Sequence, residues 1–134
     1  MTKPLCNVLI PGPFEPGFIR LKDILSRSGL SLINPGNSKI TSWTDEGEQI
    51  EIAASEVSTT VSILNISNIQ FWKTAEEDVF VSWRLLQGGT FFSLYLNGLQ
   101  AEFEVMLITR LVETVLTTFR DQYGETQALS IAFE

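Results

Sequence analysis

The clearest pattern of apolar and polar positions in the chain is a pair of alternating segments, Asp78–Leu86 and Phe91–Leu96. Alternation with a period of two predicts half-buried strands, and the Gly88-Gly89 pair between the segments predicts a tight turn. We therefore expect an antiparallel β-hairpin whose turn residues are the two glycines. In that register Leu86 lies opposite Phe91.

One face of this hairpin is apolar and the other is mixed. The apolar face, which we expect to meet the core, carries Val79, Val81, Trp83, Leu85, Phe92, Leu94 and Leu96. The mixed face carries Phe80, Ser82, Arg84, Leu86, Phe91, Ser93 and Tyr95. Three aromatic rings on one exposed sheet face form a patch that monomers seldom leave open. We therefore expect four of these residues to meet another surface, with the guanidinium lying over a ring diagonal to it: Phe80, Arg84, Phe91 and Tyr95.

Four covers are possible for this mixed face. They are the Pro/Gly-rich segment Pro11–Gly17, a helix expected at Phe18–Ser28, a second copy of the chain and a foreign partner. A symmetric contact needs no second gene product, so we expect a homo-oligomer, in the simplest case a dimer.

Two segments of the chain carry apolar residues at helical spacing. Phe18–Ser28 has a short apolar face and stops before Gly29, where a helix C-terminus favours glycine. Gln100–Tyr123 carries a longer stripe, which is Phe103, Leu107, Leu111, Val115 and Phe119. We expect both segments to be helices and the longer stripe to pack on the sheet.

Most of the remaining chain favours strands. The expected strands are Leu5–Ile10, Leu30–Ile33, Lys39–Trp43, Gln49–Ala53, Ser58–Leu64, Asn68–Lys73 and Ala128–Phe133. Three prolines within Pro11–Gly17 predict a connection without regular structure there. Together the elements predict an α+β fold in a single domain, residues 1–134. It consists of one curved antiparallel sheet of about six to eight strands, with a short N-terminal helix and a long C-terminal helix packed on it.

Composition sets limits on location and chemistry. The 134 residues are 44% hydrophobic, which is enough for a folded core, and no apolar run is long enough to cross a membrane. The first ten residues lack the apolar region of a secretory signal, and Cys6 has no second cysteine to pair with. We expect a cytoplasmic protein without membrane attachment.

The reactive side chains argue against catalysis. The chain has no histidine, so Cys6 and the serines lack their usual general base, and the common zinc patterns are excluded. Two acidic clusters occur in the sequence, one at Asp45, Glu46, Glu48 and Glu51 and one at Glu76, Glu77 and Asp78. Neither cluster has the spacing of a calcium-binding EF-hand loop. We expect no enzymatic activity, no catalytic residue, no metal site and no cofactor.

The net charge of −7 is unevenly spread. Residues 1–39 carry five basic and two acidic side chains, whereas residues 40–134 carry four basic and fourteen acidic ones. This balance disfavours nucleic acid and favours a basic protein partner. The acidic candidates for partner contact are Asp45, Glu46, Glu48, Glu51, Glu76 and Glu77, and we add Trp72 because it stands beside an acidic turn at a sheet end.

These observations favour a small, acidic, cytoplasmic protein-binding module without catalytic activity. Immunity proteins that neutralise basic toxins, and chaperones of secreted proteins, share this general profile of composition. The alternative is a helix-grip protein that binds a small apolar ligand in a cavity between the sheet and the long helix.

Overall fold

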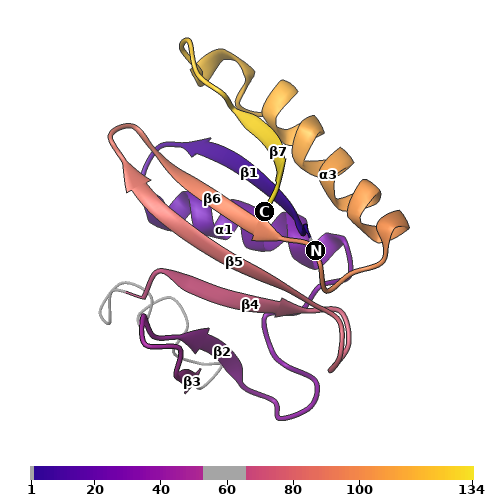
Figure 1. Cartoon of the computed structure of the whole chain (residues 1–134). Coiled ribbons are helices and arrows are strands. Elements are labelled where there is room, and N and C mark those ends of the chain that lie inside the picture. The colour runs from indigo at the N-terminus through magenta and orange to yellow at the C-terminus, as the bar shows by residue number, and fades with distance from the viewer. Residues whose placement is uncertain (1, 53–65) are drawn as a thin grey trace.

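The computed structural model describes residues 2–52 and 66–134 and has an α+β fold. Its main sheet is antiparallel, is not closed, and has the strand order β4-β5-β6-β1-β7. The strands are β1 (Pro4–Pro11), β4 (Asn68–Trp72), β5 (Asp78–Leu86), β6 (Gly89–Tyr95) and β7 (Leu129–Phe133). Figure 1 shows β1, the first strand of the chain, between β6 and β7.

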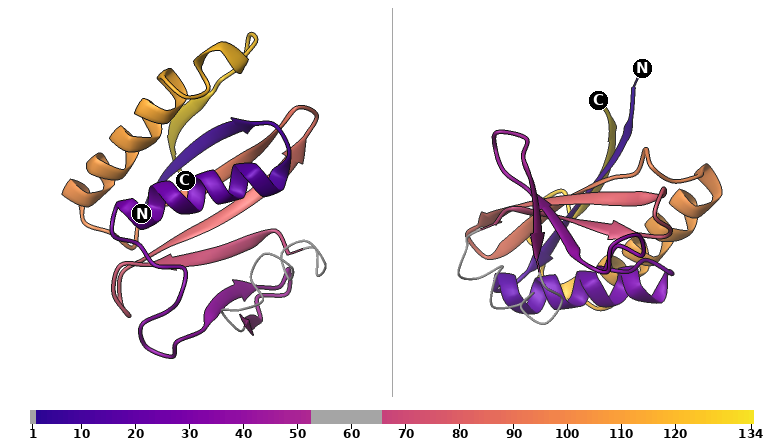
Figure 2. Two further views of the ribbon diagram at one scale, coloured as in Figure 1. Left: turned by 180° about the vertical axis from the view of Figure 1, so that it is seen from behind. Right: turned by 90° about the horizontal axis from the view of Figure 1, so that it is seen from below.

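Both helices pack on one face of this sheet, which we call the inner face. Helix α1 (Phe14–Arg27) lies across it, and α3 (Ala101–Leu116) lies beside α1 near β7 (Figure 2, left). A short 3₁₀ turn, η2 (Arg120–Gln122), follows α3 and leads to β7. The expected α+β class, with two helices on an antiparallel sheet, is confirmed.

The core lies between the helices and the inner face. The apolar side of the β5–β6 hairpin is fully buried at Val79, Val81, Phe92, Leu94 and Leu96. Trp83 is half-buried and packs with Phe14, Phe18 and Phe92, with ring centroids 5.2–6.2 Å from its own. The prediction for Leu85 was wrong, because this side chain lies near the hairpin tip and is 65% exposed.

The hairpin turn is one residue earlier than the glycine pair suggests. Gln87 and Gly88 form the turn, and Gly89 already pairs with Leu86 as the first residue of β6. Gly88 has a φ of 89°, which glycine adopts easily, while a Cβ on Gly89 would lie 2.9 Å from the Ile10 carbonyl oxygen. The register therefore differs by two residues from the prediction, and a shift of two leaves every side chain on its expected face.

The proline-rich segment is more regular than predicted. Strand β1 continues through Pro11, which pairs with Gly89, and α1 already begins at Phe14. Gly12 makes the sharp turn between them with a φ of 94°. Pro16 fits because it lies in the first turn of the helix, where backbone N–H groups have no partner within the helix.

The prediction of one continuous sheet was wrong, because β2 (Ile40–Trp43) and β3 (Gln49–Ile52) form a separate two-stranded sheet. Strand β2 runs beside β4 without a backbone ladder. Instead, the Asn68 side chain accepts a hydrogen bond from the Trp43 N–H at 2.8 Å and donates one to the Trp43 carbonyl at 2.9 Å. The Ser42 hydroxyl also donates to the Asn68 carbonyl at 2.7 Å. One side-chain amide thus does what a neighbouring peptide group would do in a ladder.

Two further elements differ from expectation. Leu30–Ile33 is no strand, since only Ser31 pairs there, in a single bridge to Trp72. Helix α3 ends at Leu116 instead of continuing to Tyr123, and the hydroxyl of Thr117 donates to the Glu113 carbonyl at the point where it stops. The expected strand Ser58–Leu64 lies outside the described residues. Within the described part of the chain, no helix has the length and apolar character needed to span a bilayer.

Candidate protein-binding surface

The sheet face opposite the helices, which we call the outer face, is the main candidate site. It is turned towards the viewer in Figure 1, and the right panel of Figure 2 shows α1 on the other side of the strands. Among residues 2–52 and 66–134, no helix covers it. Of the four covers considered, the segment Pro11–Gly17 and the first helix are therefore excluded for this face, because both pack on the inner side.

The four predicted outer-face residues come together as two cross-strand pairs. Phe80 of β5 lies opposite Tyr95 of β6, and their ring centroids are 5.5 Å apart. Arg84 lies opposite Phe91, with its guanidinium carbon 5.0 Å from the ring centroid. The guanidinium therefore covers the ring directly across from it, not a diagonal one, and remains exposed to solvent.

Polar side chains separate the two aromatic pairs. Ser82 and Ser93 lie opposite each other between them, and the Ser93 hydroxyl donates to the Asn7 side-chain oxygen at 2.7 Å. Two shallow hollows flank Tyr95, one of about 380 Å³ towards Arg84 and one of about 440 Å³ towards Phe80. Rings beside hydrogen-bonding groups are typical of the centres of protein–protein interfaces.

Strand β1 contributes to this face, which the sequence prediction missed. Leu5 lies opposite Tyr95 and lines both hollows, and Asn7 lies opposite Ser93. The alternation in residues 5–10 placed Leu5 and Asn7 on one face, but nothing local indicated that β1 would pair with β6. Only the antiparallel β1–β6 register joins the two segments.

Trp72 lies at the far end of this face, opposite Asp78 on the neighbouring strand. A chain of polar side chains runs beside it. The Trp43 indole donates to the side-chain Oε1 of Gln70 at 2.7 Å, and the side-chain Nε2 of Gln70 donates to the Asp78 carboxylate at 2.8 Å. The Trp72 ring is half-buried and its indole nitrogen has no hydrogen-bond partner in the described chain. Trp72 thus borders the aromatic pairs without joining them.

The structure separates the two acidic groups that the sequence singles out. Trp43 contacts Asn68 at the start of β4, so the turn that follows Trp43, with Asp45, Glu46 and Glu48, lies at that end. The turn with Glu76 and Glu77 follows the other end of β4. The acidic residues therefore flank the sheet at two sites and do not form one continuous cluster.

Some of the six acidic candidates form ion pairs with lysines in the described part of the chain, and others do not. Glu51 meets Lys39 at 3.4 Å and Glu77 meets Lys73 at 3.5 Å, so each has a local counter-charge. Asp45, Glu46, Glu48 and Glu76 are exposed and have no ion pair within the described chain. Among the six acidic candidates, these four have charge available to a partner.

The inner face is filled by side chains. Leu107 and Leu111 of α3 are buried against the sheet together with Cys6 of β1. Burial raises the pKa of the Cys6 thiol from 9.0 to about 11, which keeps it protonated near neutral pH. A ligand between α3 and the sheet would have to displace these side chains, so this packing disfavours the cavity alternative.

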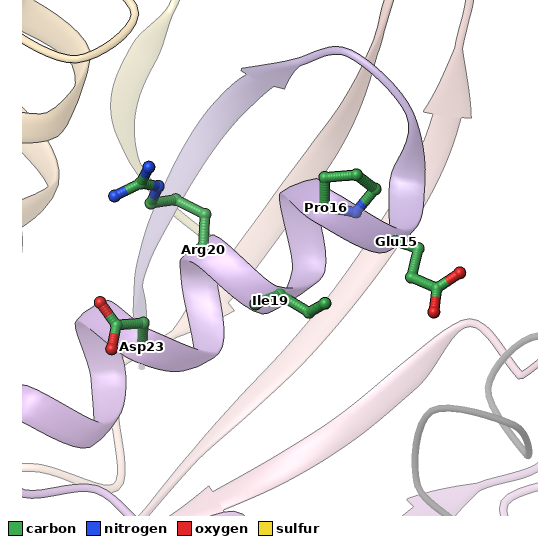
Figure 3. Close-up of a pocket in the computed structure, with 5 residues that line it drawn as sticks. All are labelled: Glu15, Pro16, Ile19, Arg20 and Asp23. Carbon is green, nitrogen blue, oxygen red and sulfur yellow. The ribbon is translucent and has the colours of Figure 1, made fainter.

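A further hollow, of about 540 Å³, lies along the solvent side of α1 (Figure 3). Its five lining residues all come from this helix, and they are Glu15, Pro16, Ile19, Arg20 and Asp23. It contains none of the predicted site residues. We regard it as ordinary helix surface, useful as a control region.

Comparison of the chain with protein-family models, with curated proteins and with solved structures finds no match. A function for this chain therefore has to rest on its own surface chemistry, and the outer face is the surface with the most specific chemistry.

Proposed function

We propose that this chain is a small acidic protein-binding module of the cytoplasm, without catalytic activity, in the manner of an immunity protein or a chaperone. A protein partner docks on the outer face, with Tyr95 at the centre of the contact. The single observation that carries this proposal is the open pair of aromatic contacts, Phe80–Tyr95 and Arg84–Phe91, on a face that no described helix covers.

The chemistry of the outer face suits a protein better than a small molecule. The hollows beside Tyr95 are open and shallow, whereas small-molecule sites enclose most of their ligand. Aromatic and arginine side chains are the residue types that contribute most to protein interfaces. The serines and Asn7 between the rings supply hydrogen-bonding groups that orient the partner.

The acidic residues that flank the sheet add a preference for a basic partner. Asp45, Glu46 and Glu48 lie at one end of β4, and Glu76 lies at the other, so a basic surface is attracted from both sides. Such exposed charges raise the association rate more than the final affinity, because water and salt screen them in the complex.

A comparison of captured proteins tests this proposal. Immobilised wild-type chain and the variants Tyr95→Glu and Ile19→Glu are incubated with lysate of the source cell at low and high salt. We expect specific proteins on the wild type and on Ile19→Glu, which changes the control surface of α1, and their loss on Tyr95→Glu. Identical retention by all three chains would exclude the outer face as the binding surface.

A further inference from the structure

We infer that two copies of this chain pair through the free edge of β7, so that the five-stranded sheets of both copies become continuous. This dimer uses a different surface from the outer face and does not depend on the function proposed above.

The backbone of β7 is prepared for another strand. The Ala128 carbonyl accepts a hydrogen bond from the Leu9 N–H, and Glu134 N–H donates to the Lys3 carbonyl, so these residues point towards β1. Along an antiparallel strand, the N–H and C=O groups of successive residues point alternately to the two sides of the strand. The N–H and C=O groups of Leu129, Ile131 and Phe133 therefore point away from β1, to the side where β7 is the last strand of the sheet within residues 2–52 and 66–134.

The two edges of the sheet differ in their protection. At the β4 edge, Ser31 makes a backbone bridge to Trp72 and the Asn68 amide binds Trp43, so both ends of that strand are occupied. Strand β7 reads Leu-Ser-Ile-Ala-Phe and contains none of the lysines, prolines or bulges that usually keep edge strands apart.

Helix α3 presents an apolar flank along the same edge. A polar groove of about 220 Å³ separates α1 from α3, and Arg110, Glu113 and Thr114 line it from α3. At 100° per residue the opposite flank of α3 carries Val105, Val112 and Leu116. This flank faces away from α1, and α3 runs alongside β7 in Figure 1 and in the left panel of Figure 2.

The flank and the strand form one apolar strip, which we call the edge strip. Leu129, Ile131 and Phe133 pair with β1 residues on the helix side of the sheet, so their side chains point towards the α3 side. Four large side chains of the strip are open to solvent, with exposed fractions of 65% for Val105, 52% for Leu116, 51% for Ile131 and 66% for Phe133. The strip carries no charge, although the chain has a net charge of −7.

A second copy satisfies both the backbone and the side chains of this strip. If β7 pairs antiparallel with itself about a two-fold axis at Ile131, Leu129 lies opposite the partner's Phe133 and the outward N–H and C=O groups bond each other. The α3 helices then lie on the same side of the joined sheet, with their apolar flanks towards each other. These four side chains expose on the order of 400 Å² per copy. With the backbone of β7 and the half-buried neighbouring side chains added, the total area buried by two copies approaches the ~1,000 Å² at which specific interfaces begin.

Sedimentation equilibrium of the whole chain tests this inference with matched variants. Phe133→Lys introduces a charge into the strip, and Leu85→Lys makes the same change at the hairpin tip, where the exposed fraction of 65% nearly equals the 66% of Phe133. Val105→Lys tests the strip from α3 and leaves the strand intact. We expect a wild-type dimer at tens of micromolar, at least a ~10-fold weaker dimer for both strip variants, and no change for Leu85→Lys.

Hydrogen exchange supplies a second readout. The amides of Leu129, Ile131 and Phe133 should exchange more slowly as the protein concentration rises, because pairing protects them. A wild-type monomer at these concentrations would overturn the inference. The edge of β7 would then be available only for pairing with a strand of another protein. A dimer that Tyr95→Glu dissociates and that Phe133→Lys and Val105→Lys leave intact would also overturn it, and would place the interface on the outer face.

Discussion

The inner and outer faces of the five-stranded sheet are built from alternate residues of the same strands, yet they differ in how deeply their side chains are buried. On β6, Phe92 and Leu94 point to the helices and are fully buried, while Phe91 and Tyr95 point outward and are only half-buried. The inner residues are held by packing against two helices. The outer residues contact each other and a few polar groups. Hydrophobicity alone therefore does not distinguish a residue that stabilises the fold from one available to a partner.

The largest effect that tests this comparison is expected from the inner face. Leu111→Ala removes a fully buried side chain of α3 and leaves a cavity, so the free energy of unfolding should fall by about 2–5 kcal/mol. Urea unfolding followed by circular dichroism measures this loss. A loss under ~0.5 kcal/mol would mean that Leu111 does not pack in the core.

A smaller loss is expected at the junction of the two sheets. Asn68→Ala leaves the Trp43 N–H and carbonyl without their partner, which should cost about 1–3 kcal/mol. Asn37→Ala is the matched control, because that exposed asparagine accepts only one local bond, from the Lys39 N–H. Equal losses in the two variants would show that the Asn68 amide has no special role.

The buried thiol gives a pH-dependent test of the inner face. Burial raises the pKa of Cys6 from 9.0 to about 11, so the unfolded chain loses this proton first as the pH rises. The stability contributed by the protonated thiol should be complete below pH 9 and be lost between pH 9 and pH 11. Unfolding curves of the wild type and Cys6→Ala across this range isolate the effect. If the free energy of unfolding changed with pH in the same way in the wild type and in Cys6→Ala, the predicted contribution of the thiol would be contradicted. Rapid reaction of the native thiol with a thiol reagent at neutral pH would also contradict it.

The outer face should tolerate a change that the inner face cannot. Tyr95→Glu removes one ring pair with Phe80 and should lower the free energy of unfolding by about 1 kcal/mol or less, well below the loss for Leu111→Ala. Thermal and urea unfolding check this value. A loss as large as that of the core variant would assign Tyr95 to the core and end the contrast between the faces.

The smallest effect on stability is expected from the acidic turn of the β2–β3 hairpin. Replacing Asp45, Glu46 and Glu48 by Ser should change the free energy of unfolding by less than ~0.5 kcal/mol, because all three are exposed. The same variant should bind a captured basic partner more slowly at low salt, with little change in the dissociation rate. An unaltered association rate at low salt, measured by surface plasmon resonance, would remove this turn from the binding surface.

Local patterns predicted the parts of the molecule that depend on local chemistry. The alternation in β5 and β6 identified both faces of the hairpin. Three members of the predicted stripe, Leu107, Leu111 and Val115, are the buried residues of α3. Phe103 and Phe119 are only half-buried, and Phe119 lies beyond the end of the helix. The turn register was missed because the reason for it is tertiary, namely the close approach of the Ile10 carbonyl to Gly89. The split of the sheet was missed for a similar reason, since no sequence pattern indicates that the Asn68 side chain will take the place of a ladder.

The candidate site was predictable only in its aromatic half. The rings Phe80, Phe91 and Tyr95 were found because the hairpin is contiguous in sequence. Leu5 and Asn7 belong to the same surface but come from a strand whose partner lies in the second half of the chain. The two acidic groups were expected to contribute to one partner-binding surface, and the direction of β2 relative to β4 places them at opposite ends of β4.

The position of β1 between β6 and β7, two strands from the second half of the chain, has a consequence for how the chain reaches its native state. The Asn7–Ser93 hydrogen bond joins residues 86 positions apart, and the Tyr123 hydroxyl bonds the Leu9 carbonyl across 114 positions. Contacts of such long sequence separation require large loops to close before they contribute stability, and proteins dominated by them fold slowly. During synthesis β1 emerges before β6 and β7, the two strands with which it pairs. We expect refolding on the millisecond-to-second scale, with the β5–β6 hairpin forming before β1 inserts beside it.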